Sequence, residues 1–263
     1  MKFSMSEAWR DAMAMMSANR EVLLIVAGIF FLLPSLGMAV TMPDFQQNMM
    51  ADPQNAQAMM AEMFRDWWWL LVVIFLAQIV GYLALLALLR DTARPTVGEA
   101  LQRGLAGLVP AIGVNLIIAV GAVLLVLVAG IVTAAVPVVG VILLIVCVLG
   151  MIYLAVKMSL VMPVIAVDRV SNPLTVIARS WALTKGNSLR LFLFFLLLGV
   201  VYVVLAMVIG AVVGLLSVVL GADTAVLVNG VISGILGAIA TVIFVAVIAA
   251  IHRQLSSPPA AVE

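Results

Sequence analysis

The chain has 263 residues, of which 66% are hydrophobic and 10% charged, and its mean hydropathy is +1.32. Soluble domains are about 45–50% apolar and about 25% charged, so a soluble chain of this length has no interior for so many apolar residues. Lipid must therefore be the solvent for much of the chain. The formal net charge of +1 excludes a general attraction to nucleic acid.

The first twenty residues are amphipathic and do not form a span. Ser4 and Glu7 have the spacing of a capping box. One helical face then carries the apolar residues Met5, Ala8, Trp9, Ala12, Met13 and Met16. We expect a helix on the cytoplasmic leaflet. A cleavable signal peptide is the alternative, and the acidic, amphipathic leader argues against it.

Six segments are long and apolar enough to cross a bilayer, which takes about 20 residues. They are predicted at 22–40, 67–89, 105–133, 138–164, 191–220 and 225–251. Pro34 should kink the first span, and Pro137 should turn the chain between the third and fourth. The predicted fold is all-α: a single polytopic transmembrane domain at 1–252 and a disordered cytoplasmic tail at 253–263.

Two further amphipathic segments separate the predicted pairs of spans. In the first, Thr96 and Glu99 repeat the capping-box spacing, and the apolar face is Val97, Ala100, Leu101 and Leu105. In the second, Asn172 is the expected N-cap, the apolar stripe is Leu174, Ile177, Ala178 and Trp181, and Lys185-Gly186-Asn187 ends the helix. The pattern is that of three units, each a surface helix with two spans. Internal duplication and a common lead-in to membrane hairpins are the two explanations.

The basic residues predict how the chain is threaded. With six spans and both termini in the cytoplasm, 12 of the 13 Lys and Arg residues lie at the inner side, and only Arg65 lies outside. The acidic residues divide 7 to 5, but orientation follows Lys and Arg. We therefore predict a multi-pass protein of the bacterial inner membrane with both termini cytoplasmic.

The predicted outer loop at 41–66 is rich in methionine. Asp52 and Pro53 predict the start of a helix, and its apolar face would be Met59, Met60, Met63, Phe64 and Trp67. A helix lying on the membrane surface explains this pattern. Copper(I) binding by the soft thioethers is the alternative for this loop.

Three polar side chains fall inside predicted spans: Lys157, Asn115 and Gln78. One interpretation is a polar pocket, open to the cytoplasm, that holds an anionic headgroup or substrate. The other, which we favour, is a lysine that extends to the interface while the amides pack between helices. The pairs Gly210-x-x-x-Gly214 and Gly230-x-x-x-Gly234 predict close packing of the fifth and sixth spans.

The sequence contains no catalytic, cofactor or metal motif. No two carboxylates share a span, Cys147 has no local base, and the sole histidine, His252, has no neighbouring acid in the sequence. We therefore expect no enzyme, no cofactor and no metal site. Asp168, Arg169 and Arg179 are the residues from which a headgroup site would be built.

Several short motifs carry a resemblance to a known family. They are the aromatic-Arg-Asp at 9–11, the apolar run at 163–167 that ends in Asp168, and the stretch at 178–184 followed by Asn187 and Arg190. With these the chain resembles the YciC-like bacterial inner-membrane proteins and the membrane domain of glycerophosphoryl diester phosphodiesterases. The resemblance implies six spans and an inner-membrane location. It supplies no activity for these residues, because the phosphodiesterase name belongs to a separate catalytic domain.

The leading expectation is a non-catalytic envelope protein that organises lipid or a partner at the cytoplasmic leaflet. Arg179, Lys185 and Arg190 would contact anionic lipid, each contributing about 1 kcal/mol. The first alternative is a small transporter with a polar pocket near Lys157 and Asn115, and the second is an enzyme acting on lipid headgroups. Membrane lipids are the expected partners, together with a protein partner or a second copy of the chain.

Overall fold

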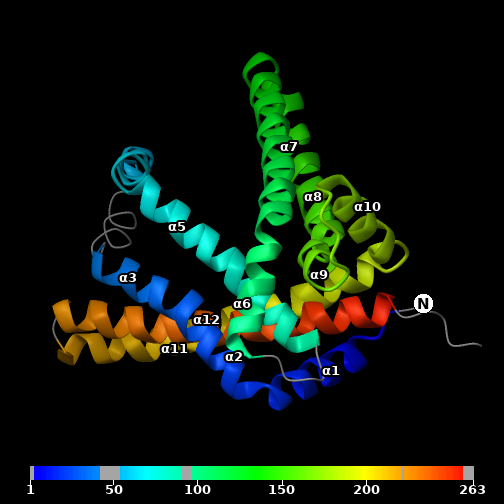
Figure 1. Cartoon of the computed structure of the whole chain (residues 1–263). Coiled ribbons are helices and arrows are strands. Elements are labelled where there is room, and N and C mark those ends of the chain that lie inside the picture. The colour runs from blue at the N-terminus through cyan, green and yellow to red at the C-terminus, as the bar shows by residue number, and fades with distance from the viewer. Residues whose placement is uncertain (1–2, 42–53, 91–95, 221, 257–263) are drawn as a thin grey trace, which may run out of the picture.

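The computed structural model describes residues 3–41, 54–90, 96–220 and 222–256, and all of their regular structure is helical (Figure 1). The helices are α1 Met5–Ala18, α2 Arg20–Ala27, η1 Gly28–Leu32, α3 Leu33–Thr41, α5 Ala56–Arg90, α6 Val97–Ala106, α7 Leu108–Ala135, α8 Pro137–Met158, α9 Val161–Ala166, α10 Pro173–Thr184, α11 Ser188–Leu220 and α12 Ala222–Ser256. The predicted all-α class is confirmed.

Six helical segments of the described chain are long and apolar enough to cross a membrane. They run over 20–39, 56–90, 108–135, 138–166, 188–215 and 228–256, so each predicted span is confirmed as a long apolar helix. The α12 helix ends at Ser256, so the first residues of the predicted disordered tail are helical.

The α5 helix differs most from its prediction. It begins at Ala56 and continues without a break into the second span, so the separate surface helix predicted in the 41–66 loop is wrong. Met60 and Phe64, expected on a buried face, are exposed. Asp52 and Pro53 lie outside the described residues. Once a helix has formed, each further residue adds a backbone hydrogen bond at little cost, and residues 56–67 contain no proline or glycine that would end the helix.

Proline interrupts the first span near Pro34, as expected, and also the fourth span near Pro163, where no break was predicted. The first span contains η1, a π-helical turn in which the Leu33 N–H donates to the Gly28 carbonyl. Pro34 follows Leu33. It has no N–H to donate to the Phe30 carbonyl, and its ring would clash with that carbonyl in a regular α-helical turn. Pro163 has no N–H to donate to Ser159, and there the fourth span breaks into α8 and α9. The chain turns between α7 and α8 as predicted, and Pro137 itself is the first residue of α8.

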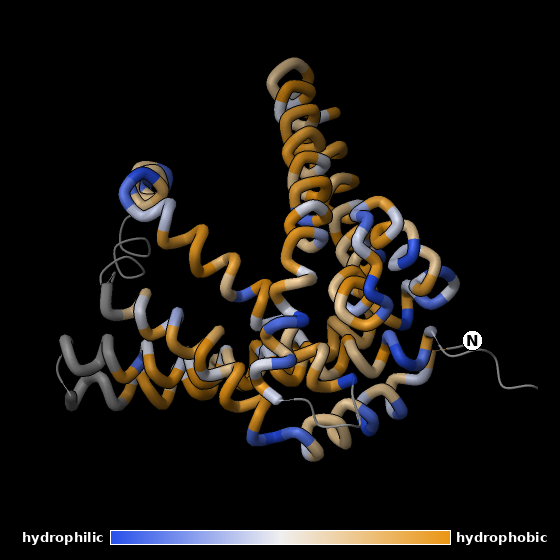
Figure 2. Tube along the Cα trace, in the orientation of Figure 1, coloured by the Kyte–Doolittle hydropathy of each residue, from blue (hydrophilic) through white to orange (hydrophobic). Residues whose placement is uncertain are grey.

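The buried side chains gather at one end of the long helices. They come from the last turns of α5 and α12, from α9, and from the short helices α1, α6 and α10. The remaining lengths of α7, α8 and α11 are apolar and exposed. They extend away from this core in two arms, α7 beside α8 and α11 beside α12 (Figure 1, Figure 2). In water such surface is unstable, whereas in a bilayer it faces hydrocarbon.

The three amphipathic helices follow one packing pattern. The α6 helix packs on α5, α10 packs on α8 and α7, and α1 packs on α12. Thus α6 and α10 each pack on the second span of the pair that precedes them in the chain. The α1 helix packs on α12, the second span of the last pair. The α5–α6 contact is close, since a Cβ on Gly104 would lie 2.6 Å from the Val80 carbonyl oxygen.

Two of the three predicted caps form as expected. The Thr96 hydroxyl accepts from the Glu99 N–H at 3.3 Å, and the Glu99 carboxylate accepts from the Thr96 N–H at 3.1 Å. The Asn172 side chain accepts from the backbone N–H groups of Leu174 and Thr175. Gly186 ends α10 in the left-handed conformation, with φ +82°.

The capping box predicted at the first helix is wrong. Ser4 is the N-cap of α1, but its side chain caps no backbone group. Gln254 of α12 takes the role expected of the Glu7 carboxylate, because its Oε1 accepts from the Ser4 N–H at 3.2 Å. Its Nε2 donates to Glu7 Oε2 at 3.0 Å and so holds that carboxylate. The glutamine lies 250 residues away along the chain, where a local pattern cannot reveal it.

The predicted apolar faces of two helices are only partly buried in the protein. In α10 the buried residues are Val176, Ser180 and Thr184, whereas Leu174 and Trp181 of the predicted stripe are exposed. Ile177 of the stripe packs against the core, and the exposed part of the stripe is the face that a helix on a membrane surface would turn to lipid. In α6 Ala100 is buried as expected, whereas Leu105 is exposed.

The glycine pairs do not join the fifth span to the sixth, as the sequence had predicted. A Cβ on Gly230 would lie 2.6 Å from Ala39 Cβ, and one on Gly234 would lie 3.0 Å from Leu32. These glycines therefore bring α12 against the first span. A Cβ on Gly210 or Gly214 would meet no atom within 4 Å.

Candidate functional site

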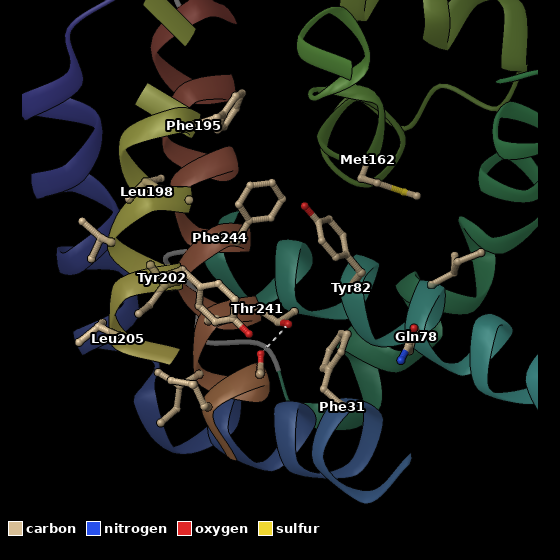
Figure 3. Close-up of a pocket in the computed structure, with 18 of the residues that line it drawn as sticks. Phe31, Gln78, Tyr82, Met162, Phe195, Leu198, Tyr202, Leu205, Thr241 and Phe244 are labelled. Carbon is tan, nitrogen blue, oxygen red and sulfur yellow. Dashed lines mark hydrogen bonds between the residues drawn. The ribbon is translucent and has the colours of Figure 1, made fainter. Parts of the chain in front are cut away.

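A cavity of about 830 Å³ lies between α5 and the α11–α12 pair (Figure 3). Its volume is within the range of sites that hold small ligands. The η1 turn contributes Phe31, α9 contributes Met162, and α1 contributes Trp9. All lining residues except Trp9 belong to segments able to cross a membrane. The cavity is thus built where spans diverge from the common core.

The cavity wall is mainly aromatic and aliphatic. Phe75 lines it from α5, Phe195 from α11 and Phe244 from α12, and the Phe195 and Phe244 rings lie 5.9 Å apart. No Asp, Glu, Lys, Arg or His occurs among its lining residues. Such a wall suits hydrocarbon and gives a charged group no counter-ion.

A small number of uncharged polar groups interrupt this wall. Gln78 and Tyr82 come from α5, Asn115 from α7, Tyr202 from α11 and Thr241 from α12. Both tyrosine hydroxyls point into the space between α5 and the α11–α12 pair (Figure 3). Thr241 donates to the Gly237 carbonyl at 2.8 Å, and the Asn115 amide donates to the Ala111 carbonyl at 2.8 Å.

The cavity is open at its side. Phe75, Tyr202, Leu205 and Phe244 line it and are at the same time exposed on the molecular surface. Because these residues belong to spans, the opening lies at the level of the hydrocarbon if the spans cross a bilayer. A ligand would then enter laterally, from the lipid phase.

Two of the three intramembrane polar residues predicted from sequence, Gln78 and Asn115, line this cavity, and Lys157 does not. Lys157 is 2% exposed and lies between two rings, with its Nζ 5.2 Å from the centroid of Trp181 and 5.5 Å from that of Tyr153. In the described part of the chain no carboxylate lies within ion-pair distance of this lysine. The predicted meeting of Lys157 with Asn115 is not among the contacts of the structure.

The aromatic setting of Lys157 has a clear physical basis. The two rings meet edge to face at 5.7 Å, and their π-faces attract the ammonium where a carboxylate is lacking. Ser180 of α10 donates to the Lys157 carbonyl at 2.7 Å and fixes α10 against α8. The spacing of Tyr153 and Lys157 by one helical turn is visible in the sequence, whereas Trp181 is brought in by the fold.

A polar cluster joins α10 to the end of α12. The sequence had grouped Asp168 with Arg179, and the structure adds His252. Asp168 Oδ2 accepts from Arg179 Nε at 2.5 Å and lies 3.2 Å from His252 Nε2. His252 therefore has an acidic neighbour, contrary to expectation, at a distance of 84 residues along the chain. Arg169 adopts φ +56°, which turns the chain beside this cluster.

The basic residues predicted to contact lipid share one exposed region. Arg179 is half-exposed while it pairs with Asp168, and Lys185 and Arg190 are exposed. The apolar residues Trp181 and Leu189 of the same stretch of chain are also exposed. Cys147 is partly exposed on α8. No group of three metal-ligating His, Cys, Asp or Glu side chains occurs within residues 3–41, 54–90, 96–220 and 222–256.

Taken together, these features define a class: an all-helical protein with six segments able to cross a membrane and a lateral, uncharged cavity between them. No family model, no curated protein and no solved structure matches the chain. The class therefore rests on the fold and the cavity.

Proposed function

We propose that this chain is a non-catalytic protein of the bacterial inner membrane that binds and organises lipid at the cytoplasmic leaflet. The observation that carries the proposal is the cavity of about 830 Å³, whose wall is uncharged and which opens sideways among the spans. In a bilayer lipid is the surrounding solvent and is present at the opening. An apolar void of this size loses dispersion contacts along its walls unless lipid chains fill it.

The short helices support the cytoplasmic placement. We propose that α1, α6 and α10 lie at the inner interface, where Leu174 and Trp181 face lipid and Lys185 and Arg190 meet anionic headgroups. Basic residues close to the surface are each expected to add about 1 kcal/mol to this contact. The resemblance to the YciC-like inner-membrane proteins agrees with this location.

The transporter and the headgroup enzyme remain alternative predictions. A transporter requires a hydrated, selective path, and the lining of this cavity is apolar. A headgroup enzyme has one observation in its favour, the contact between Asp168 and His252. A carboxylate that orients a histidine is one part of many hydrolytic sites, and a nucleophile or metal is also needed.

Filling the cavity tests the proposal. Gly237 and Gly199 line the cavity, and a Cβ on either meets no atom within 4 Å. Gly237→Leu or Gly199→Leu should therefore occupy the space and reduce the lipid retained by the purified protein several-fold. Native mass spectrometry of protein released from detergent measures retained lipid. Gly150→Leu is the matched control, because Gly150 also has open space but lies outside the lining.

The three variants separate specific from general lipid binding. If Gly237→Leu and Gly150→Leu retain as much lipid as the unaltered protein, the cavity is not a lipid site and the proposal is wrong. If all three leucine variants lose lipid equally, retention reflects the outer surface of the helices, and the proposal is wrong for that reason.

A further inference from the structure

The polar groups of the cavity have more hydrogen-bonding capacity than the chain uses. The Gln78 amide and the hydroxyls of Tyr82 and Tyr202 make no hydrogen bond within the described residues, and they line the cavity. The Asn115 amide nitrogen bonds its own helix, which leaves its carbonyl oxygen available. None of these atoms is enclosed by protein, since every fully enclosed side-chain N or O atom has a partner. The free groups are therefore open to whatever occupies the cavity.

Free polar groups at this position favour a ligand that is itself polar. Water satisfies such groups in a soluble protein, whereas hydrocarbon offers them nothing, and each unsatisfied group at membrane depth costs several kcal/mol. Gln78 and Tyr82 stand one helical turn apart on α5, so their amide and hydroxyl donors share one wall. A pure alkyl chain would leave these donors unpaired.

The same wall excludes a charged ligand group. None of its residues is charged, and the nearby Lys157 lies outside the lining with its ammonium between two aromatic rings. A phosphate placed among these groups would be desolvated without a counter-ion, which is the most costly arrangement in a bilayer. The polar part of the ligand is therefore uncharged.

We propose that the cavity selects an uncharged, carbonyl-bearing lipid of the diacylglycerol class. An ester carbonyl of the lipid accepts from the Gln78 amide and the Tyr82 hydroxyl, its free hydroxyl donates to the Asn115 carbonyl oxygen, and its chains lie along Phe75, Phe195 and Phe244. This inference rests on the proposed function, because it names the class of lipid that the same cavity holds.

A competition between two lipids with identical chains and one hydrocarbon without a polar group tests the selectivity. The full-length protein, delipidated in detergent, is given equimolar dioleoylglycerol, dioleoyl phosphatidate and squalene, and the lipids retained are counted by native mass spectrometry. We expect dioleoylglycerol to be retained about tenfold or more over dioleoyl phosphatidate, because the cavity has no cation for the phosphate. Squalene, which has no polar group, should be retained less than dioleoylglycerol.

Single substitutions then test the hydrogen bonds. Tyr82→Phe and Gln78→Leu should each lower dioleoylglycerol retention about 3- to 10-fold and leave squalene retention unchanged. Tyr153→Phe is the control: it removes a hydroxyl outside the cavity and keeps the ring beside Lys157. Comparison with squalene separates a lost hydrogen bond from a misfolded variant, which would lose both lipids.

The inference and the proposed function fail in different ways. Retention of phosphatidate or squalene equal to that of dioleoylglycerol overturns the inference, as does an unchanged preference in both Tyr82→Phe and Gln78→Leu. The proposed function survives these results if Gly237→Leu still removes retained lipid. If Gly237→Leu removes none, the cavity holds no lipid and both proposals fail.

Discussion

Gln254 shows how a single side chain far along the chain replaces a local cap. The sequence pairs Ser4 with Glu7, and the structure places an amide from α12 between them. Beside it Arg253 forms an ion pair with Asp11, and the Asn187 side chain accepts from the Phe3 N–H at 3.0 Å. The start of α1 is thus held by side chains from α12 and from the turn between α10 and α11.

We expect Gln254→Ala to loosen α1 selectively. Loss of a side-chain cap costs about 1 kcal/mol, so the melting temperature in detergent should fall slightly and amide exchange in α1 should accelerate most. Hydrogen–deuterium exchange with mass spectrometry measures this helix by helix. Gln102→Ala is the control, because Gln102 is exposed on α6. Equal exchange in α1 for both variants would contradict the role given to Gln254.

For Lys157 the sequence predicts the depth in the membrane but not the partners of the side chain. Its depth in the fourth span is evident from the sequence, and so is the polar character of Asn115 and Gln78. Their partners are not, because the lysine meets Trp181 across a loop and the amides face a cavity made by other spans. The sequence thus identified Gln78 and Asn115, which line the cavity, whereas Lys157 lies against Tyr153 and Trp181 outside it.

At the scale of elements, the spans, two of the three caps and the packing of the fifth span on the sixth could be predicted, whereas the glycine contact of the sixth span with the first could not. Span length, proline breaks and the Thr96–Glu99 box depend on residues within a few positions of one another. The choice of neighbour depends on which surfaces fit, as in the contact of Gly230 and Gly234 with the first span. The side opening of the cavity follows from that choice.

The glycine contact gives a sharp test of helix pairing. Gly230→Leu should push α3 from α12 and destabilise the protein by about 1–3 kcal/mol, because the added side chain has no space beside Ala39. Gly210→Leu, on the open face of α11, should change stability little. Thermal unfolding of both variants in one detergent measures the difference. An equal loss for the two variants would refute the pairing of the first and sixth spans.

At the scale of the whole molecule, one end is a packed core and the other end is open to the surroundings. The packed end holds α1, α6, α10 and most of the basic residues predicted to be cytoplasmic. The α5 helix has 35 residues, about 50 Å, which exceeds the ~30 Å hydrocarbon core of a bilayer. In the proposed threading its first turns extend beyond the hydrocarbon. Lipid fills the space between the arms in this account.

The account depends most directly on six crossings with both termini in the cytoplasm. In a Cys147→Ala background, single cysteines at Asn55 and Gln102 can be labelled in intact cells with a reagent that does not cross the inner membrane. We predict that Asn55→Cys is labelled from the periplasm and that Gln102→Cys reacts only after the membrane is opened. The reverse pattern would invert the threading, and labelling of both sites from outside would contradict the crossings themselves.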